Sequence, residues 1–341
     1  MKLSIEPIRI ETAHPFQIAR GTRKQYEVFV VTLESDGLEG MGEAAPHPFY
    51  GESPMSVRAA IQSIGRFLDV EPETARANLN TEGCDLFEVL RPHASVRAAL
   101  DAALWDLRGR REGLPVWKLI GADAAKAPLT SYTIGFDQPE VVDAKVDAAA
   151  AYRILKVKVG IPGDMQMLDR IIARSGKTVR VDANEGWDLE AAIENTRELF
   201  RRRVEFCEQP LPHADTEGLR QLKRVSSLPI VLDESIVDPE DVAACRDQGH
   251  GINIKLVKCG GITRALALIE AARACEMSVM IGCMIETSLG VTAAAHVSPL
   301  CDYADLDGNL LLASDPFEGV RVAEGRLVLP NEPGLGVRRV G

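Results

Sequence analysis

Two lysines alternate with apolar residues in the stretch 155–159, Leu-Lys-Val-Lys-Val, near the middle of the 341-residue chain. Period-2 geometry along a strand places Lys156 and Lys158 on one face and the apolar residues on the other. Desolvating an ammonium group is costly, so lysine is almost never fully buried without a partner. We therefore expect both lysines to have a chemical task. The alternative is a solvated pair on an edge strand.

Four further short strands each carry an ionisable residue at or near the end: 178–184, 204–210, 229–235 and 251–255. The successive steps from Lys158 to Asp182, Glu208, Asp233 and Lys255 are 24, 26, 25 and 22 residues. One strand, one helix and two turns need about that length, so the repeat is a βα unit. Eight such units close into a barrel whose active site lies at the C-terminal ends of the strands.

Asp182, Glu208 and Asp233 end three successive strands, so their carboxylates should converge at the barrel mouth. A divalent cation would offset their repulsion, and an oxygen-only donor set suits one Mg²⁺ per subunit, with Mn²⁺ as a substitute. No histidine lies at these strand ends, which disfavours zinc. The alternative is a salt-bridge network between these carboxylates and the nearby lysines.

Lys158 on the second strand and Lys255 on the sixth should face each other across this metal. Two such bases can remove a proton from the carbon beside a bound carboxylate on one face and return it on the other, which is racemisation or epimerisation. The metal is needed because the dianionic enolate must be stabilised as its charge develops. Crowding beside a cation should lower the pKa of the lysines, as a base working near neutrality requires.

Composition indicates a globular protein whose partner is a small molecule. Hydrophobic residues make up 46% of the chain, enough for two domains with a sizeable core. The net charge of −11 argues against nucleic acid and anionic membranes. No run approaches the ~18 apolar residues of a membrane span, and the chain begins with a strand rather than a signal peptide, so we expect a cytoplasmic protein. Seven cysteines without a C-x-x-C pattern disfavour a disulfide framework.

The first third of the chain has a different pattern of elements. Antiparallel strands are expected there at 3–10, 28–33 and 38–43. A basic loop, 18–24, joins the first two strands, and an aromatic loop, 47–53, follows the third. A long amphipathic helix should begin at the cap Ser95 and end before Gly113. We expect a capping domain over residues 1–125, completed by residues 318–341.

Residues 126–317 should form the barrel, with Ser131 and Thr133 on one face of its first strand. Helices are expected at 189–200 and 262–274, the seventh strand at 280–286 and the eighth at 303–308. A hairpin around Glu324-Gly325 should return to the first domain. Gly260-Gly261 is read as a strand-to-helix turn, with a phosphate cradle as the alternative.

The combination of Lys156-x-Lys158, Asp182-Ala183-Asn184, Glu208-Gln209-Pro210, Asp233-Glu234-Ser235 and Ile254-Lys255 resembles the enolase superfamily, muconate-lactonizing subgroup, over nearly the whole chain. The resemblance implies a (β/α)7β TIM-like barrel with an N-terminal α+β capping domain, and enolate chemistry on Mg²⁺. It assigns catalysis to Lys158 and Lys255, metal binding to the three carboxylates, and supporting roles to Asn184 and Glu234. It does not fix the substrate, since cycloisomerases, o-succinylbenzoate synthases and epimerases share these residues.

Asp305 and Asp307 narrow the choice of substrate. They resemble the Asp-x-Asp motif of dipeptide epimerases, which holds the α-ammonium group of the substrate. The alternative is an acidic strand end bound to an arginine. By the same resemblance, Cys283 and Ile285, and Ser131 or Thr133, line the pocket. We further expect Lys156 to lend positive charge to the enolate.

The loop 18–23 resembles that of the L-Ala-D/L-Glu epimerases, in which an arginine at the position of Arg23 meets the glutamate side chain. Arg20 and Lys24 compete for this role. We therefore expect an isomerase that epimerises dipeptides, with L-Ala-D/L-Glu from peptidoglycan turnover as the leading substrate, and a homo-oligomer. A cycloisomerase or o-succinylbenzoate synthase is the alternative within the superfamily. A Schiff-base lysine aldolase is the alternative from another class, and a non-catalytic binding protein is a third.

Overall fold

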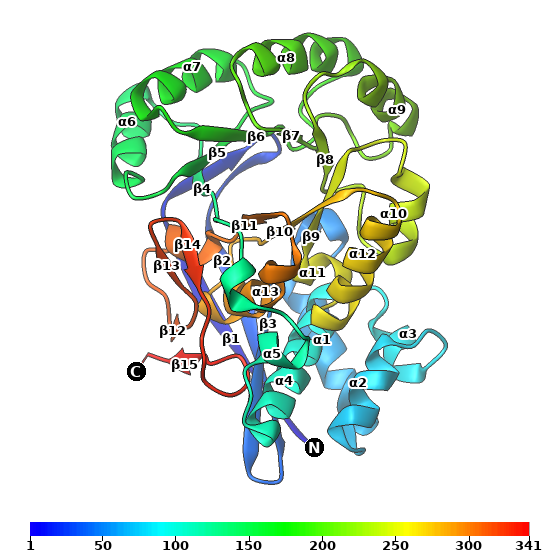
Figure 1. Cartoon of the computed structure of the whole chain (residues 1–341). Helices are drawn as coiled ribbons and strands as arrows, with labels where there is room; N and C mark the ends of the chain where they lie inside the picture. Colours follow the sequence, from blue (N-terminus) through cyan, green and yellow to red (C-terminus); the bar gives the residue numbers. More distant parts are fainter. Residues whose placement is uncertain (341) are drawn as a thin grey trace.

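The capping sheet is built from three antiparallel strands, β1 (Lys2–Ile18), β2 (Gly21–Ser35) and β3 (Leu38–Ala44). The computed structural model describes residues 1–340, and for Ile18 the backbone alone. β2 begins at Gly21, well before the expected residue 28, so most of the basic loop belongs to a long β1–β2 hairpin. This hairpin runs from the capping sheet toward β5 and β6 of the barrel (Figure 1).

Helices cover one face of this sheet: α1 (Pro54–Ile64), α2 (Pro72–Asn80), α3 (Asp85–Leu90) and α4 (Ala94–Glu112). The short α5 (Val116–Leu119) follows α4, and its Val116 belongs to the core of the barrel. α4 packs closest. Gly40 and Gly42 on β3 have no side chain, and a Cβ at either position would collide with backbone oxygens of α4. The apolar core between them includes Phe29, Leu33 and Leu104.

The expected cap of α4 is wrong. The helix begins at Ala94, its N-cap is His93, and Ser95 lies inside the first turn. The Glu52 side chain, which comes from the 47–53 loop, accepts a hydrogen bond from the Ser95 backbone N–H at 3.0 Å. A carboxylate from another segment thus supplies the acceptor that the sequence pattern assigned to a local hydroxyl.

The barrel is a parallel sheet of eight strands in sequential order: β4 (Tyr132–Ile134), β5 (Ile154–Lys158), β6 (Thr178–Asp182), β7 (Cys207–Glu208), β8 (Ile230–Leu232), β9 (Gly251–Lys255), β10 (Ser278–Gly282) and β11 (Tyr303–Asp305). A parallel bridge between Thr130 and Ala304 brings its first and last strands together. The expected (β/α)7β architecture with a capping domain is confirmed.

Helices in the seven gaps between strands surround this sheet (Figure 1). They are α6 (Pro139–Ala148), α7 (Asp164–Ser175), α8 (Leu189–Arg201), α9 (Thr216–Val225), α10 (Pro239–Cys245), α11 (Leu256–Cys259) with α12 (Ile262–Ala274), and α13 (Ser288–Val297). α12 has the expected bounds, and α8 extends one residue beyond the expected end. No helix within residues 1–340 combines the length and apolar character needed to cross a membrane.

Five barrel strands, β6, β7, β8, β10 and β11, are shorter than expected, and the last two bear on the predicted site residues. β10 ends at Gly282, so Cys283 and Ile285 lie on the loop that follows it, where the Glu286 carboxylate accepts a hydrogen bond from Met284 N–H at 2.7 Å. β11 ends at Asp305, which places Asp307 just beyond the strand. Apolar side chains continue past both strand ends because these loops remain buried, so hydrophobicity alone does not mark where pairing stops.

The alternative of a phosphate cradle at Gly260-Gly261 is wrong, because the capping domain fills this turn. A Cβ at Gly260 would approach the Arg97 guanidinium, and one at Gly261 would approach Asp101. Asp101 accepts hydrogen bonds from the backbone N–H of Thr263 at 2.8 Å and from its hydroxyl at 2.7 Å. The start of α12 is therefore capped by a side chain of α4.

The C-terminal hairpin, β13 (Arg321–Ala323) and β14 (Arg326–Val328), forms as expected, but it packs on the barrel. Leu129 forms a bridge with Arg326, and Thr130 N–H donates to Gly325 O at 2.9 Å. The segment after the hairpin does reach the capping domain, where Leu335 N–H donates to Asp106 at 2.8 Å. Two further short strands, β12 (Phe317–Glu318) before the hairpin and β15 (Arg338–Arg339) after it, pair with each other. Gly341 lies outside the described residues.

Candidate active site

A cavity of about 720 Å³ lies between the capping domain and the C-terminal ends of the barrel strands. From the barrel it is lined by Lys156, Lys158, Asp233, Lys255, Asp305 and Asp307, and from the capping domain by Arg20, Arg23, His47 and Tyr50. The βα spacing in the sequence brings the first group together, since each residue lies at or near the C-terminal end of a strand of the same parallel sheet. The second group comes from the loops that the sequence places over the mouth.

Lys156 lies at the centre of the acidic residues and is fully buried. Its Nζ is 2.7 Å from Asp305 Oδ2, 2.7 Å from Glu208 Oε2 and 3.1 Å from Asp182 Oδ2. Burial alone would lower its pKa, but these carboxylates together raise the pKa well above its ordinary value. Lys156 is therefore a fixed positive charge.

Lys158 and Lys255 stand on strands β5 and β9, four strands apart in the eight-stranded barrel, and thus on opposite sides of it. Lys158 Nζ lies 2.7 Å from Asp182 Oδ2, and Lys255 Nζ lies 2.7 Å from Asp233 Oδ2. Both side chains line the cavity. The structure thus places the two lysines as the sequence analysis expected, with the carboxylates between them.

The expectation of lowered lysine pKa values concerns lysines beside a bound cation and stays a prediction, whereas here Lys255 contacts a carboxylate. Burial favours the neutral amine, but contact with Asp233 and the nearby Glu208 outweigh it, so its pKa is raised. In return the lysines depress the pKa of Asp182 and Asp233 despite their burial, whereas burial and the neighbouring Asp182 raise the pKa of Glu208 to about 8. The carboxylates that neutralise the lysines are the same groups that a divalent cation would bind.

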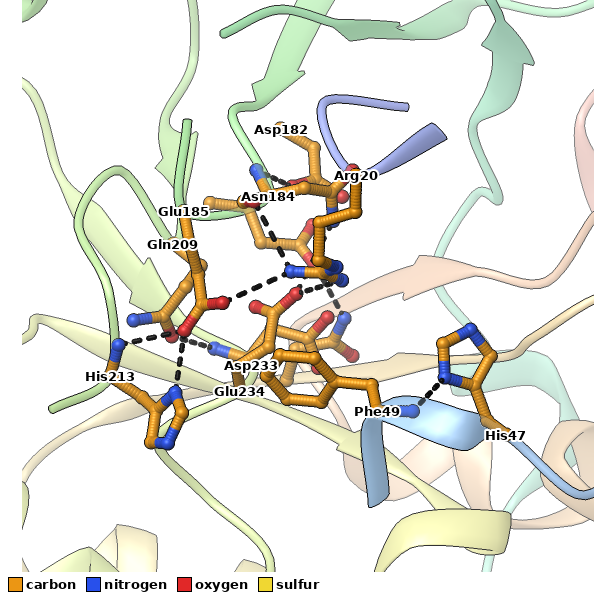
Figure 2. Close-up of polar contacts among 12 residues, drawn as sticks. Arg20, His47, Phe49, Asp182, Asn184, Glu185, Gln209, His213, Asp233 and Glu234 are labelled. Carbon is orange, nitrogen blue, oxygen red and sulfur yellow. Dashed lines mark hydrogen bonds and ion pairs between the residues drawn. The ribbon is translucent and has the colours of Figure 1, made fainter. Parts of the chain in front are cut away.

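Loop residues after the strands hold two of these carboxylates in place. The backbone N–H of Asn184 donates to Asp182 Oδ1 at 2.9 Å, with Asn184 in the left-handed region at φ 44°. The Gln209 side chain accepts from the backbone N–H of Asp233 at 2.9 Å and of Ser235 at 3.2 Å. Asn184 Nδ2 also lies 3.4 Å from Glu234 Oε1, so both residues predicted to be supporting belong to this layer (Figure 2).

Asn253 and Lys258 also contact the carboxylates, and the sequence analysis missed them. Asn253 Nδ2 donates to Glu208 Oε1 at 2.7 Å, and Lys258 Nζ lies 2.5 Å from Asp233 Oδ1. Their signal was the polar pattern Asn253-x-Lys255-x-x-Lys258 at the end of an apolar strand. Only its middle member, Lys255, lies at the spacing of the βα repeat.

Asp305 and Asp307 both reach the cavity, but each already has partners. Asp305 accepts from Ser131 Oγ at 2.6 Å and from Lys156, and Asp307 accepts from the backbone N–H of Thr133 at 2.5 Å. Burial and the neighbouring Asp305 raise the pKa of Asp307 to about 7. Thr133 lines the cavity, whereas Ser131 lies behind Asp305 and acts on it by hydrogen bonding.

The three cationic candidates in the hairpin differ in their contacts. Arg20 donates to Glu234 at 2.6 Å and to Glu185 at 3.3 Å, and its guanidinium lies 4.5 Å from the centre of the Phe49 ring (Figure 2). Arg23 lines the cavity and forms no ion pair with any residue of the described chain. Arg23 and Lys24 are both exposed, but Lys24 lies outside the lining. Arg23 is therefore the cation with capacity for a ligand.

Two further candidates, Cys283 and Ile285, line the cavity as expected. Cys283 accepts a hydrogen bond from Gly308 N–H at 3.3 Å, and burial raises the pKa of its thiol well above the ordinary value. The thiol is therefore protonated near neutrality. Cys283 and Ile285 can shape the pocket by packing.

The donor chemistry at the strand ends fits a hard cation, although the side chains are not already arranged around one. Among residues 1–340, no three acidic, histidine or cysteine side chains form a ready metal cage, because the ammonium groups lie between the carboxylates. A cation would have to replace these ammonium contacts. Glu208 Oε2 favours this, since it is buried and its contact with the Lys156 ammonium group at 2.7 Å is one that a cation could replace.

The contacts in the structure are those of the salt-bridge alternative. The assignment of Asp182, Glu208 and Asp233 as metal ligands stays a prediction. Oxygen-only donors fit Mg²⁺ better than zinc.

Comparison with known proteins gives matches over almost the whole chain. Residues 4–121 match the N-terminal domain of the mandelate racemase / muconate lactonizing enzyme family, and residues 140–339 match the enolase C-terminal domain-like family. An L-Ala-D/L-Glu epimerase of Bacteroides thetaiotaomicron is 36% identical, with 100% of this chain and 88% of the relative covered. An L-Ala-D/L-Glu epimerase of Escherichia coli is 37% identical, with 92% and 95% covered.

A solved structure has the same fold as this chain. The dipeptide epimerase from Cytophaga hutchinsonii, crystallised with Mg and the dipeptide D-Ala-L-Val, superimposes with a TM-score of 0.91 at 27% identity. The match covers 99% of this chain and 95% of that one.

Proposed function

This chain belongs to the mandelate racemase / muconate lactonizing enzyme group of the enolase superfamily, and on that premise we propose that it is a Mg²⁺-dependent dipeptide epimerase. The reaction is a 1,1-proton transfer through an enolate intermediate. The observation that carries the proposal is the pair Lys158 and Lys255 on opposite sides of three buried carboxylates, with Asp305 and Asp307 at the same mouth.

Asp182, Glu208 and Asp233 would hold the cation, which supplies positive charge for the substrate carboxylate and for the charge that develops when the α-proton leaves. Lys158 and Lys255 take opposite faces of the α-carbon, one removing a proton and the other returning one. Lys156 stays protonated and adds a fixed positive charge to the centre. The covering hairpin and the 47–53 loop exclude water from the reacting carbon.

Asp305 and Asp307 suit the other end of the substrate, the α-ammonium group. A muconate or succinylbenzoate substrate has no cation to place beside two buried carboxylates, which favours the epimerase over a cycloisomerase or o-succinylbenzoate synthase. Asp305 already forms an ion pair with Lys156, so Asp307 has more capacity to bind the ammonium group of a substrate.

We infer that the second residue of the dipeptide is glutamate. Arg23 lines the cavity without an ion pair, and a guanidinium can hold a carboxylate through two hydrogen bonds. The two relatives described above are L-Ala-D/L-Glu epimerases, whereas the Cytophaga structure holds a dipeptide with an apolar second residue. The fold alone thus does not determine the second residue of the dipeptide. The choice of glutamate depends on Arg23. We further propose that the protein is a cytoplasmic homo-oligomer and that it acts on peptidoglycan peptides.

The test is deuterium uptake at the α-carbon in D₂O across a set of L-Ala-Xaa dipeptides. We expect uptake with L-Ala-L-Glu, loss of uptake in EDTA and recovery with Mg²⁺. Asp182→Asn, Glu208→Gln and Asp233→Asn should each remain folded and inactive. Full activity in EDTA, together with trapping of the substrate on a lysine by borohydride, would instead indicate a Schiff-base aldolase. Formation of a new ring would indicate a cycloisomerase.

A further inference from the structure

Lys258 is the most deeply buried lysine near the site, with a side chain only 1% exposed. It lies on α11, three residues after Lys255 and one turn beyond the end of strand β9. Its ammonium group donates to Asp233 O at 2.6 Å, to Asp233 Oδ1 at 2.5 Å and to Asn253 O at 3.1 Å. These three acceptors satisfy all three N–H donors of the ammonium group, so none is left for a ligand.

The two lysines divide the carboxylate of Asp233 between them. Lys258 contacts Oδ1, whereas Lys255 contacts Oδ2 at 2.7 Å. Lys255 lines the cavity, and Lys258 does not. Lys258 also binds the backbone oxygen of Asp233, so it restrains both the main chain and the rotation of the carboxyl group. Oδ2 is consequently the oxygen that can change partners.

The same ammonium group also connects to the support of Glu208. Lys258 donates to the backbone oxygen of Asn253, and the Asn253 side chain donates to Glu208 Oε1 at 2.7 Å. Asn253 is fully buried beside Gly282, where a Cβ would approach its side-chain oxygen to 2.7 Å. Two of the three carboxylates are thus oriented from behind by one layer of side chains on β9 and α11.

We propose that Lys258 is a positioning residue for the cation site, which fixes one oxygen of Asp233 so that the other faces the cavity. The inference rests on the proposed function, since it assigns Asp233 to a bound cation. Groups that orient metal ligands from behind change metal affinity when they are removed, even though they never touch the ion. Lys258 makes no contact with substrate space and takes no part in proton transfer.

The test measures Mg²⁺ binding directly, without substrate, by isothermal titration calorimetry on the full chain. Lys258→Met removes the charge and the donors but keeps a long side chain. We expect the Kd for Mg²⁺ to rise by about 10- to 100-fold. Lys223→Met is the matched control, because Lys223 donates to two backbone oxygens, Arg246 O and Gly249 O, at 2.6 Å each and contacts no carboxylate there. Its Mg²⁺ affinity should equal that of the wild type.

Two more variants separate positioning from folding. Lys258→Arg keeps charge and donors and should recover part of the affinity, whereas Lys258→Gln keeps a donor without charge and should fall between Arg and Met. A folded Lys258→Met protein with wild-type Mg²⁺ affinity would overturn the inference alone. So would loss of folding in both the Met and Gln variants that Mg²⁺ does not reverse, because Lys258 would then serve the fold. A wild-type protein that does not bind Mg²⁺ would overturn the proposed function itself.

Discussion

At the scale of single residues, the lysines of the site are distinguished by what surrounds them. Lys156 is enclosed by carboxylates from three strands, and Lys258 has no free donor. Lys158 and Lys255 each touch one carboxylate and reach the cavity from opposite sides. These last two are therefore the residues that can exchange a proton with a substrate.

This arrangement predicts that the two lysines divide the reaction by stereochemistry. Lys158→Ala should abolish α-proton exchange from one epimer of L-Ala-Glu and leave some exchange from the other through Lys255. Lys255→Ala should give the mirror-image result. Deuterium incorporation into each separate epimer, followed by NMR, measures this. Normal epimerisation by both variants would rule out a two-base mechanism.

We expect different kinetic outcomes from replacing Arg23 and Arg20, because Arg20 already forms ion pairs and Arg23 does not. Arg23→Ala should lower kcat/KM for L-Ala-L-Glu much more than for L-Ala-L-Leu. Arg23 is exposed, so loss of its contact with the glutamate side chain should cost up to about 1 kcal/mol, or roughly fivefold in kcat/KM. Steady-state kinetics on the two dipeptides make the comparison. Equal losses on both would show that Arg23 does not select the side chain.

Sequence reasoning identified the residues that recur from strand to strand more easily than the residues that support them. Lys158, Asp182, Glu208, Asp233 and Lys255 recur with the period of a βα unit, so spacing alone brings them together. Asn253 and Lys258 have no such period. Their role depends on how the chain turns from β9 into α11, and the sequence does not specify the direction of a side chain after that turn.

At the scale of elements, Arg20 fastens the tip of the β1–β2 hairpin to the barrel. Arg20 donates to Asn184 O at 3.2 Å, to Glu185 and to Glu234, and it stacks on Phe49 of the second capping loop. It thus connects both capping segments to loops that follow β6 and β8. Its side chain remains 29% exposed, so these contacts can open without unfolding a core.

Arg20→Ala should therefore loosen the hairpin without changing the preference for the second residue. We expect KM to rise for L-Ala-L-Glu and L-Ala-L-Leu by a similar factor, and faster amide hydrogen exchange over residues 19–24. Exchange over α4, which does not contact Arg20, is the internal control. A selective loss on L-Ala-L-Glu alone would transfer the specificity role from Arg23 to Arg20.

The elements themselves were largely predictable, and their ends were less so. Gly37 in its turn and the alternating apolar residues predicted the β2–β3 hairpin, and the 3.6-residue period predicted α4 and α12. The true start of α4 depends on Glu52, a residue 43 positions away, and the true end of β10 depends on a turn held by Glu286. Contacts between distant segments set these boundaries, and no local pattern encodes them.

At the scale of the whole molecule, the architecture followed from the sequence but the docking of its parts did not. The repeat of strand-end residues predicted the barrel, and the different pattern of elements in the first third predicted a capping domain. The junctions use buried polar pairs, Asp101 with Thr263 and Glu43 with Thr287, which join segments 162 and 244 residues apart. Isolated polar residues within apolar stretches give no indication of their partners.

Glu43 makes this junction sensitive to pH. It lies on β3, is 3% exposed, and accepts hydrogen bonds from the backbone N–H and hydroxyl of Thr287 at the start of α13. Burial, and then the neighbouring Glu286, raise its pKa from 4.5 to about 8. The folded protein therefore keeps this proton up to about pH 8, whereas the unfolded chain loses it near pH 4.5. Between these values the folded state binds more protons, so the contribution of Glu43 to the free energy of unfolding falls as pH rises.

Glu43→Gln removes this titration and keeps a side chain of similar shape between β3 and α13. The wild type should therefore lose stability relative to the variant as pH rises from about 5 to about 8, by up to about 1.4 kcal/mol for each pH unit. Denaturant unfolding of both proteins at several pH values measures the difference. Glu39→Gln, an exposed position on the same strand, controls for the loss of one negative charge. The free energy of unfolding of the wild type minus that of Glu43→Gln is the decisive quantity. If this difference stays constant over the pH range, Glu43 is ionised in the folded junction.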